Sequence, residues 1–369
     1  MKAVIFTDRL VKRLSQVTRI VSTKNQLPIL GNVLVSFEEG NITLTTTNLE
    51  TAISTKITAV IEKEGKTTVP AKQLYELISL LKDEKLTLSV YGASLIIEGK
   101  KGTNKLATTP HTDFPPLKVK KEKPNMVLKE KDLRKTIEEL SIATSQDENR
   151  PQLGGVRFSK IDKETEIAAT DGYRLSVVRV KGEVIGITKP VVFPIKTLHE
   201  VIRIAAEEKA KTIEARVIEE TNQAVFTFEN VTVVSRLIGT DFPPYQKIIP
   251  DTFKTRIVVD KEELLNSVKI ASIFARESAN IVKIKSEKTT IVVSANAPSV
   301  GENTQSLDVE IEGEGTEIAF NYRFLLDMLS VINTERVVLE TTGTLDPGVF
   351  KPEGEEGFLH VIMPVRVRG

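Results

Sequence analysis

Few residues of this chain have the types and spacing that chemistry needs. The sequence holds three histidines, His111, His199 and His360, and none lies at metal-ligand spacing from another. Cysteine is absent, which excludes disulfides and thiolate metal sites. The chain contains no nucleophile elbow, P-loop or dinucleotide-binding string, and no cluster of acids that could hold the two metals of a polymerase. We therefore expect no catalytic residue, no metal and no cofactor.

Asp171, in the string ATDGYRL, is the one carboxylate that could be imagined as catalytic. An Asp-Gly pair at a strand turn is the stronger interpretation, because glycine relieves the strain of a positive φ. Matching places in the chain hold Thr47, Thr170 and Ser294. A position that recurs for architecture is a poor candidate for catalysis, so the sequence predicts a structural turn.

The elements around these residues are repeated. The five residues Thr-Asp-Phe-Pro-Pro occur at 112–116 and again at 240–244. Proline cannot donate to a β-ladder and pushes its predecessor into an extended conformation, so the string can end a sheet cleanly. A duplicated unit that ends in the same stop explains this better than chance.

Helical patterns recur with the same layout. Amphipathic segments open three units at residues 8–22, 131–145 and 262–276. A second helical segment follows a strand in each unit, after Pro70, Pro194 and Asn321. Proline is tolerated at a helix start, and asparagine can serve as an N-cap.

Alternating and β-branched runs lie between these helices, among them GNVLVSFEEGNITLTTTN, VTVVSRLIG, TTIVVSAN and RVVLETTG. Such runs, bounded by turn residues, indicate antiparallel strands and hairpins. The fold class is therefore α+β, built from three tandem copies of a two-helix and antiparallel-sheet domain. We place the domains at residues 1–124, 125–252 and 253–369, with the Lys-rich string after the first TDFPP as a linker.

Bulk composition limits the possible functions. The formal net charge is +1 and aromatic residues make up 5% of the chain, whereas nucleic-acid binders usually carry a surplus of positive charge and base-stacking aromatics. No run of 18 apolar residues and no signal peptide is present, so a cytoplasmic protein is expected. Any contact with DNA must come from sorting the charges onto one face.

Basic residues gather on some helices. In the first helix Leu10, Leu14, Val17 and Val21 form an apolar stripe, and the opposite stripe is free of carboxylates. That stripe consists of Arg9, Lys12, Arg13, Gln16 and Arg19. A similar spacing relates Asn266, Lys269, Ser272 and Arg276, and also Lys196, His199 and Arg203.

A solvated face is the plain interpretation of any single basic helix, and other helices carry mixed charge. If the basic faces do touch DNA, the contacts are weak, salt-dependent and independent of base sequence. Such contacts would suffice for a closed ring around the duplex, because escape then requires opening of the ring.

Four strings carry a resemblance to a known family: LPILGN at 27–32, ATDGYRL at 169–175, DFPPY at 241–245 and VIMPVR at 361–366. Together they resemble the bacterial DNA polymerase III beta subunit family, the sliding clamps, over the whole chain. The resemblance implies the DNA clamp fold, in which a head-to-tail homodimer forms a ring with helices lining the hole and sheets outside. It implies a non-enzymatic processivity factor for DNA replication.

The resemblance also implies a peptide-binding pocket between the second and third domains, where the replicative polymerase catalytic subunit, the clamp loader, and repair and translesion polymerases dock through QLxLF-like segments. Apolar walls there could bury a partner's Leu and Phe, and a methionine suits a site with many clients. Carried over by motif, the pocket residues are Leu153, Thr170, Gly172, Tyr173, Arg174, Leu175, Pro243, Lys247, Ile248, Val361, Met363, Pro364, Val365 and Arg366.

The chain departs from the commonest family pattern at three of these positions. Tyr173 stands where histidine is frequent, Lys247 where arginine is frequent, and Val365 where methionine is frequent. The chain also runs on as VRG after the last motif. Lysine does not replace the bidentate contacts of arginine, so these changes bear on which partners are preferred.

For DNA, the resemblance points to Lys24 and to Gln146 and Arg150 in the loop SQDENRPQL. Added to the basic helix faces, the predicted DNA-facing set is Arg9, Lys12, Arg13, Arg19, Lys24, Lys72, Gln146, Arg150, Lys196, Arg203, Lys269 and Arg276. For the dimer, the resemblance implies that Leu77 and Leu106 of one subunit contact Ile273 and Phe274 of the other. Consecutive residues of a helix cannot both face one core, so one hydrophobe there should be exposed.

Two alternatives stay open on the sequence. One is a repeat-built protein-interaction scaffold that never encircles DNA. The other is a nucleotidyl-transferring enzyme, which the missing acid cluster disfavours.

Overall fold

The computed structural model describes residues 1–22, 27–117, 123–147, 149–181, 186–239 and 241–366. It divides into two compact units, one of Met1–Glu130 with Lys196–Leu237 and the other of Lys131–Ile195 with Ile238–Gly369. Each is described on its own. Lys24 and residues 118–122 of the first linker lie outside the described residues.

The first unit contains two antiparallel sheets. Strands of the five-stranded sheet run in the order β5-β1-β7-β8-β9. Their bounds are Lys2–Phe6 (β1), Val60–Lys63 (β5), Lys85–Tyr91 (β7), Ser94–Glu98 (β8) and Thr103–Ala107 (β9).

The second sheet of this unit has eight strands in the order β10-β15-β16-β17-β4-β3-β2-β6. Pairing of β17 with β4 joins strands from the beginning and the middle of the chain into one sheet. The bounds are Asn32–Glu38 (β2), Asn41–Thr47 (β3), Thr51–Thr58 (β4), Gly65–Pro70 (β6), Met126–Lys129 (β10), Thr212–Ile218 (β15), Gln223–Thr227 (β16) and Val231–Arg236 (β17).

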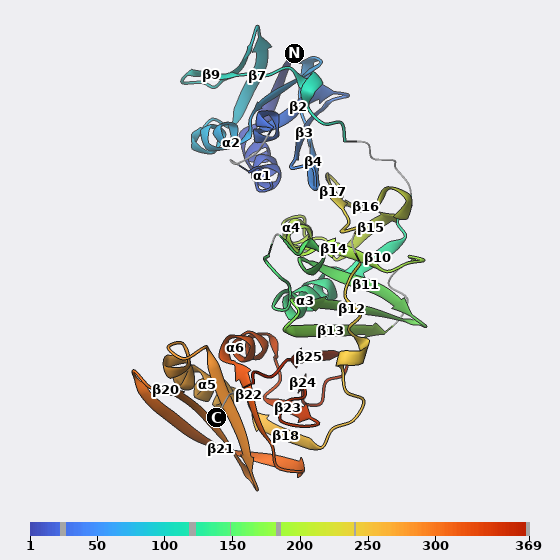
Figure 1. Cartoon of the computed structure of the whole chain (residues 1–369). Helices are drawn as coiled ribbons and strands as arrows, with labels where there is room; N and C mark the ends of the chain where they lie inside the picture. Colours follow the sequence, from blue (N-terminus) through green and yellow to red (C-terminus); the bar gives the residue numbers. More distant parts are fainter. Residues whose placement is uncertain (23–26, 118–122, 148, 182–185, 240, 367–369) are drawn as a thin grey trace. The chain divides into compact units, whose positions relative to one another are not determined.

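Among its described residues, the first unit has three helices: α1 (Thr7–Thr18), α2 (Ala71–Leu80) and α4 (Ile195–Glu207). Helices α1 and α2 lie side by side (Figure 1), and α1 packs on β3 and β4. Leu10, Leu14 and Val17 of α1 are almost wholly buried, as its apolar stripe predicts. The helices α2 and α4 begin directly after Pro70 and Pro194, where the missing N–H costs nothing.

The second unit has one sheet of twelve strands, in the order β14-β11-β12-β13-β25-β24-β23-β18-β21-β20-β19-β22. Here the pairing of β13 with β25 joins the middle of the chain to its end. The bounds are Gly155–Ile161 (β11), Glu164–Thr170 (β12), Arg174–Lys181 (β13), Val191–Pro194 (β14), Thr255–Asp260 (β18), Ile281–Glu287 (β19), Thr290–Ala297 (β20), Gly301–Gly313 (β21), Glu317–Asn321 (β22), Arg336–Thr341 (β23), Gly348–Pro352 (β24) and Phe358–Ile362 (β25).

Helices α3 (Glu130–Ser141), α5 (Lys261–Ala275) and α6 (Tyr322–Val331) belong largely to the second unit. Helices α5 and α6 pack together, and α5 lies against β20 and β21 (Figure 1). Asp260 caps α5 by accepting a 2.9 Å hydrogen bond from the Glu263 N–H, and Asn321 caps α6 by accepting one of 3.0 Å from the Arg323 N–H. The expected N-cap at Asn321 is confirmed.

Runs of antiparallel strands separated by single helices agree with the α+β class, and the hairpin predicted at 32–47 is formed by β2 and β3. Its turn places Glu39 and Gly40 at φ of 51° and 74°, which suits a two-residue hairpin. Short 3₁₀ turns complete the fold at Pro28–Gly31, His111–Asp113, Pro151–Leu153, Glu219–Thr221 and Gln246–Ile248.

Candidate functional site

A pocket of about 440 Å³ opens in the second unit. Its walls come from the turn before β11, from the β12–β13 turn, from the segment 243–248 and from the end of β25. The lining residues are Arg150, Gln152, Leu153, Thr170, Gly172, Tyr173, Arg174, Leu175, Pro243, Tyr245, Ile248, Val361 and Met363.

The β12–β13 turn shapes one wall. Asp171 Oδ1 accepts hydrogen bonds from the N–H groups of Tyr173 (2.9 Å) and Arg174 (3.0 Å), and Gly172 has a φ of 93°. Asp171 is thus engaged in holding the turn, and the predicted structural role is confirmed. The turn leaves Tyr173 61% exposed at the rim of the pocket.

Arg174 is fixed beside this turn. Its Nε donates to Asp171 Oδ2 (3.0 Å), its Nη1 donates to Asp327 Oδ2 (2.6 Å), and its guanidinium carbon lies 4.4 Å from the centre of the Phe324 ring. Two carboxylates therefore balance its single charge. Arg174 is consequently a rigid donor in the wall rather than a free cation.

The floor and the rim differ in burial. Leu153, Leu175 and Val361 are buried in the floor, and Leu175 and Val361 face each other on paired strands. Ile248 and Met363 at the rim are 40% and 38% exposed. Exposed apolar side chains around an apolar floor are what an interaction site for hydrophobic side chains needs.

The pocket gathers most of the residues expected there, but four of them do not line it. Val365 donates its backbone N–H to the Ala319 carbonyl (2.8 Å), which ties the segment after Met363 to β22. Lys247 and Arg366 are exposed outside the lining, and Pro364 and Val365 are half-buried outside it. The motif-based assignment named more residues than line the pocket, because a sequence motif does not say which of its side chains face the cavity.

Three lining residues were missed. Tyr245 directly follows the FPP string, and its position next to Pro243 was the available signal. Gln152 had no such signal. Arg150 was assigned to DNA, but it lines the pocket near Gly172.

Apart from the exposed Arg9, the basic stripe of α1 is engaged by carboxylates and is not the freely solvated face that the sequence indicated. Gln16 is fully buried, and its amide donates to Glu207 (3.0 Å) and Glu208 (3.1 Å). Arg13 and Lys12 pair with Glu208 at 2.6 Å and 3.0 Å, and Arg19 pairs with Glu207. The carboxylates come from the end of α4 and the residue after it, more than 180 residues further along the chain, so the helical pattern of α1 could not reveal them.

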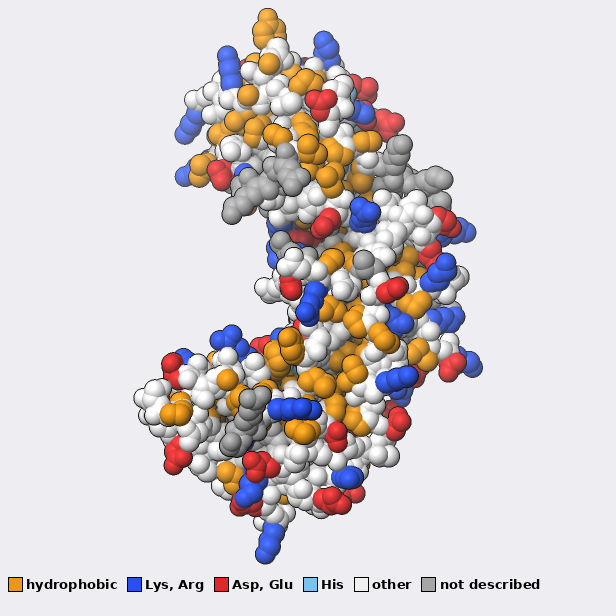
Figure 2. Space-filling view, viewed as in Figure 1, with side chains coloured by type: hydrophobic (Ala, Val, Ile, Leu, Met, Phe, Trp, Pro, Cys, Tyr) orange, Lys and Arg blue, Asp and Glu red, His pale blue; other side chains and the backbone are white. Residues whose placement is uncertain are grey.

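Other residues of the predicted DNA-facing set are more accessible. The side chains of Arg9, Gln146, Lys196, Lys269 and Arg276 are exposed. Lys72 is half-buried, and Arg203 is exposed with a 3.4 Å contact to Glu200. Ser272, expected on the basic face of α5, is buried. On the face shown in Figure 2, basic and acidic side chains are interspersed rather than gathered into one field.

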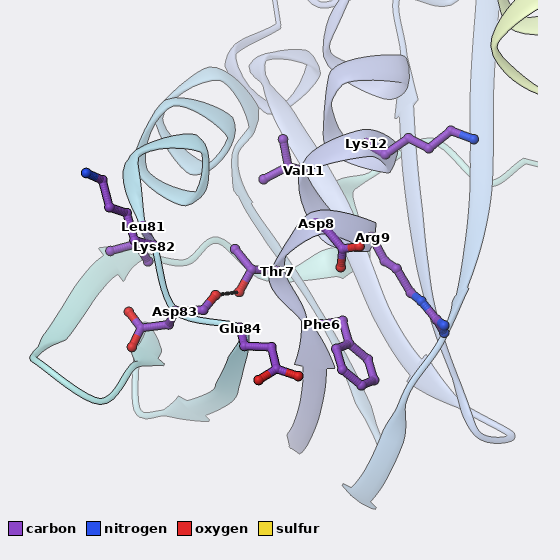
Figure 3. A pocket seen from close by; sticks show the side chains of 10 residues that line it. All are labelled: Phe6, Thr7, Asp8, Arg9, Val11, Lys12, Leu81, Lys82, Asp83 and Glu84. Atoms are coloured by element: carbon purple, nitrogen blue, oxygen red, sulfur yellow. Dashed lines mark hydrogen bonds between the residues drawn. The ribbon is translucent and has the colours of Figure 1, made fainter.

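A second hollow of about 780 Å³ lies in the first unit, between the start of α1 and the segment before β7 (Figure 3). The Thr7 hydroxyl donates to the Asp83 carbonyl, and the Arg9 guanidinium carbon lies 5.1 Å from the centre of the Phe6 ring. Lys12 and Lys82 point away on opposite sides. Because Asp8, Asp83 and Glu84 share the lining with these cations, the hollow is not built for a ligand of one charge.

The hydrophobes expected at the dimer contact lie at the surface of their units. Ile273 on α5 is 53% exposed while Phe274 is half-buried, so the two consecutive residues do face different surroundings. Leu77 on α2 and Leu106 on β9 are both half-buried.

Neither a metal centre nor a membrane segment is visible in the described parts of the chain. Among these residues no group of three His, Cys, Asp or Glu could hold a metal ion. Within the same ranges no helix is both long and apolar enough to pass through a bilayer.

This repeated α+β fold, with its non-catalytic pocket, defines a DNA clamp. Family models described as the N-terminal, central and C-terminal domains of the DNA polymerase III beta subunit match residues 1–118, 127–244 and 246–366. The chain therefore belongs to the DNA polymerase III beta subunit family. Members of this family are sliding clamps, the non-catalytic processivity subunit of the replicative polymerase, and this is the function of the chain.

Known relatives support this family assignment over the whole length of the chain. The beta sliding clamp of Rickettsia felis is 30% identical over 379 residues, covering 100% of both chains. The crystal structure of the Bacillus subtilis sliding clamp is 27% identical, with a TM-score of 0.93 and 100% coverage of both chains. The sliding clamp of Bartonella birtlesii, solved bound to griselimycin, is also 27% identical, with a TM-score of 0.93 and 100% coverage of both chains.

Proposed function

We propose that this clamp acts as a head-to-tail homodimeric ring around duplex DNA and recruits its partners through the pocket in the second unit. The observation that carries the recruitment part is an apolar floor with an exposed apolar rim, at Ile248 and Met363. The ring has three domains per subunit, at 1–124, 125–252 and 253–369. The gap between the matched family segments 1–118 and 127–244 supports the first border, whereas the third matched segment begins at residue 246, seven residues before the proposed second border. The clamp works in the cytoplasm.

The partners are proteins that carry QLxLF-like segments: the replicative polymerase catalytic subunit, the clamp loader, and repair and translesion polymerases. Their Leu and Phe side chains would cover Leu175 and Val361 and bury the rim. Arg174 would offer its remaining N–H groups to peptide carbonyls, because both of its carboxylate partners hold it in place.

Peptide binding tests the pocket directly. We expect Met363→Ala to lower the affinity for a Gln-Leu-x-Leu-Phe peptide about tenfold, because a rim side chain that the peptide buries is lost. Leu345→Ala removes a hydrophobe that is 57% exposed outside the lining and serves as the matched control. Calorimetry measures both, and equal affinities would reject the pocket.

For the dimer, we propose that β9 of one subunit meets β21 of the other. In the part of the chain that the structure describes, β9 pairs with β8 alone, and Gly301–Asp308 of β21 pairs with β20 alone. Two open strand edges can extend a sheet between copies. Leu77 and Leu106 would then cover Ile273 and Phe274.

Mass in solution tests the dimer. A stable species of twice the chain mass is expected at micromolar concentration, and Ile273→Asp should shift it toward monomer by burying a charge in the contact. Lys269→Asp, on the same helix but outside the proposed contact, should leave the dimer intact. A monomeric wild-type protein would contradict the ring.

Encirclement of DNA is tested by topology. The proposed ring holds DNA by closure, with weak phosphate contacts from exposed residues such as Lys196, Lys269 and Arg276. Clamps loaded onto a closed DNA circle should stay until the circle is cut and should then slide off. Equal loss from closed and cut circles would refute encirclement.

A further inference from the structure

The wall of the pocket made by residues 242–249 is anchored by a buried polar cluster that the clamp function has not yet explained. Tyr245 is 1% exposed, and its hydroxyl donates to Glu166 Oε1 at 2.6 Å. Glu166 is itself 2% exposed on β12. Burying a carboxylate carries a desolvation cost, which hydrogen-bond and ion-pair partners must offset.

Two arginines complete the cluster. Arg179 Nε donates to Glu166 Oε2 at 3.0 Å, and Arg157 Nη1 donates to the Tyr245 hydroxyl at 3.0 Å. Burial raises the pKa of the Tyr245 hydroxyl, and its hydrogen bond to Glu166 raises it further. The hydroxyl therefore remains a proton donor to the carboxylate throughout the physiological range.

These residues share one face of the twelve-stranded sheet. Glu166 pairs with Arg179 and Ala168 pairs with Val177 across β12 and β13, so their side chains follow one another on that face. Toward the other end of the same face lie Leu175 and Val361, which form the pocket floor.

The Tyr245 ring connects the buried polar cluster at one end of this sheet face with the pocket floor at the other end. It packs in one cluster with Ala168, Leu175 and Val361, and it also lines the pocket. Its backbone carbonyl accepts the Ile248 N–H at 2.9 Å, which closes the 3₁₀ turn that presents Ile248 at the rim. The hydroxyl is thus tied to the polar cluster, while the ring and the backbone hold the pocket wall.

We propose that Tyr245, held by Glu166, is a positioning residue that sets partner-peptide affinity by fixing Pro243 and Ile248 before the peptide arrives. This inference rests on the proposed peptide-binding function. A preformed wall lowers the ordering cost of binding, so loosening it acts mainly on the dissociation rate.

The test uses the full-length clamp and a labelled peptide containing Gln-Leu-Ala-Leu-Phe. Tyr245→Phe keeps the ring but removes the hydroxyl, and we expect about tenfold weaker binding through faster dissociation. Glu166→Gln keeps an acceptor for the hydroxyl, so its loss should be smaller, about threefold. The double variant should bind about as weakly as Tyr245→Phe, because both changes act on the contact between the Tyr245 hydroxyl and Glu166, which is already lost in Tyr245→Phe. Tyr91→Phe, at a site 82% exposed in the first unit, is the matched control.

Hydrogen exchange provides a readout that general destabilisation would not move. Without peptide, Tyr245→Phe should lose amide protection at residues 242–249 while β20 and β21 keep theirs, and peptide should restore it. Wild-type affinity in both Tyr245→Phe and Glu166→Gln, or unchanged protection at 242–249, would overturn the inference while leaving the pocket in place. Failure of the wild-type clamp to bind the peptide would instead overturn the pocket and the inference together.

Discussion

Helices α1 and α5 open the first and third repeats, and each carries a predicted basic stripe, but the two stripes have different surroundings. On α1, the Arg13 side chain is 11% exposed and is paired with Glu208, whose side chain is 9% exposed. On α5, Lys269 and Arg276 are exposed. Similar spacing of basic residues on two helices therefore does not mean that the same charge is available to a ligand, because the partners of a charge come from other elements.

The largest effect should follow from removing the carboxylate beside α1. Glu208→Ala leaves Arg13 nearly buried without its 2.6 Å partner, and we expect a loss of about 3 kcal/mol in the free energy of unfolding. Lys269→Ala on α5 should change it by less than about 0.5 kcal/mol. Urea denaturation measures both, and similar losses would remove the distinction between the two helices.

Helix α3, which opens the second repeat, carries a buried carboxylate that should make the stability of the protein depend on pH. Burial raises the pKa of Glu139 to about 7, Glu355 and Glu138 raise it too, and Lys135 opposes them. The folded state then binds more protons than the unfolded state between about pH 4.5 and 7, so stability falls as pH rises through this window. Glu139→Gln should remove that slope and stabilise the protein at pH 8 by about 2 kcal/mol.

Glu138→Gln is the control for this change, because Glu138 is exposed on the same helix. Thermal denaturation at pH 5, 6, 7 and 8 distinguishes the two variants. A slope that persists in Glu139→Gln would assign the pH dependence to other groups.

A smaller difference concerns how the two helices begin. Helix α5 has Asp260 as N-cap, whereas α1 follows Phe6 and has no side-chain cap. Asp260→Ala should cost about 1 kcal/mol, and Asp260→Asn, which can still accept the Glu263 N–H, should cost much less. Equal costs in a urea titration would show that the cap hydrogen bond is not the source of the effect.

The smallest effect concerns DNA. Each exposed cation that contacts a phosphate contributes about 0.9 to the slope of log affinity against log salt concentration. Lys269→Ala or Arg276→Ala should lower the slope by about that amount, whereas Arg13→Gln, which removes a cation already paired with Glu208, should leave it unchanged. Fluorescence titration of a short linear duplex at several salt concentrations measures these slopes, and a change only in the α1 variant would invert the comparison.

Local signals in the sequence were enough to predict the repeated units and most of their helices, strands and turns. The apolar stripe of α1 predicted the burial of Leu10 and Leu14, and Asn321 was placed correctly as an N-cap. Asp171-Gly172 was placed correctly as a turn. Each of these depends on neighbours within a few residues, which the chain order provides directly.

Long-range contacts were where the sequence fell short. The string FPPY predicted a domain end, but not that Tyr245 would line the pocket and bond to Glu166, 79 residues earlier. The VIMPVR string located the pocket, but pairing of Val365 with Ala319 turned its last residues away from the cavity. Side-chain direction at such places is decided by strands that meet only in the folded chain.

By itself, the sequence determined that this protein is built from repeated α+β units, because hydrophobic period and turn chemistry are written in consecutive residues, and its four motifs carried the resemblance to the sliding clamps. Only the tertiary structure decided which charges are neutralised and which side chains meet at the pocket. Burial and ion pairing act through space, and Arg13 with Glu208 and Glu166 with Tyr245 become neighbours only when distant strands and helices pack together.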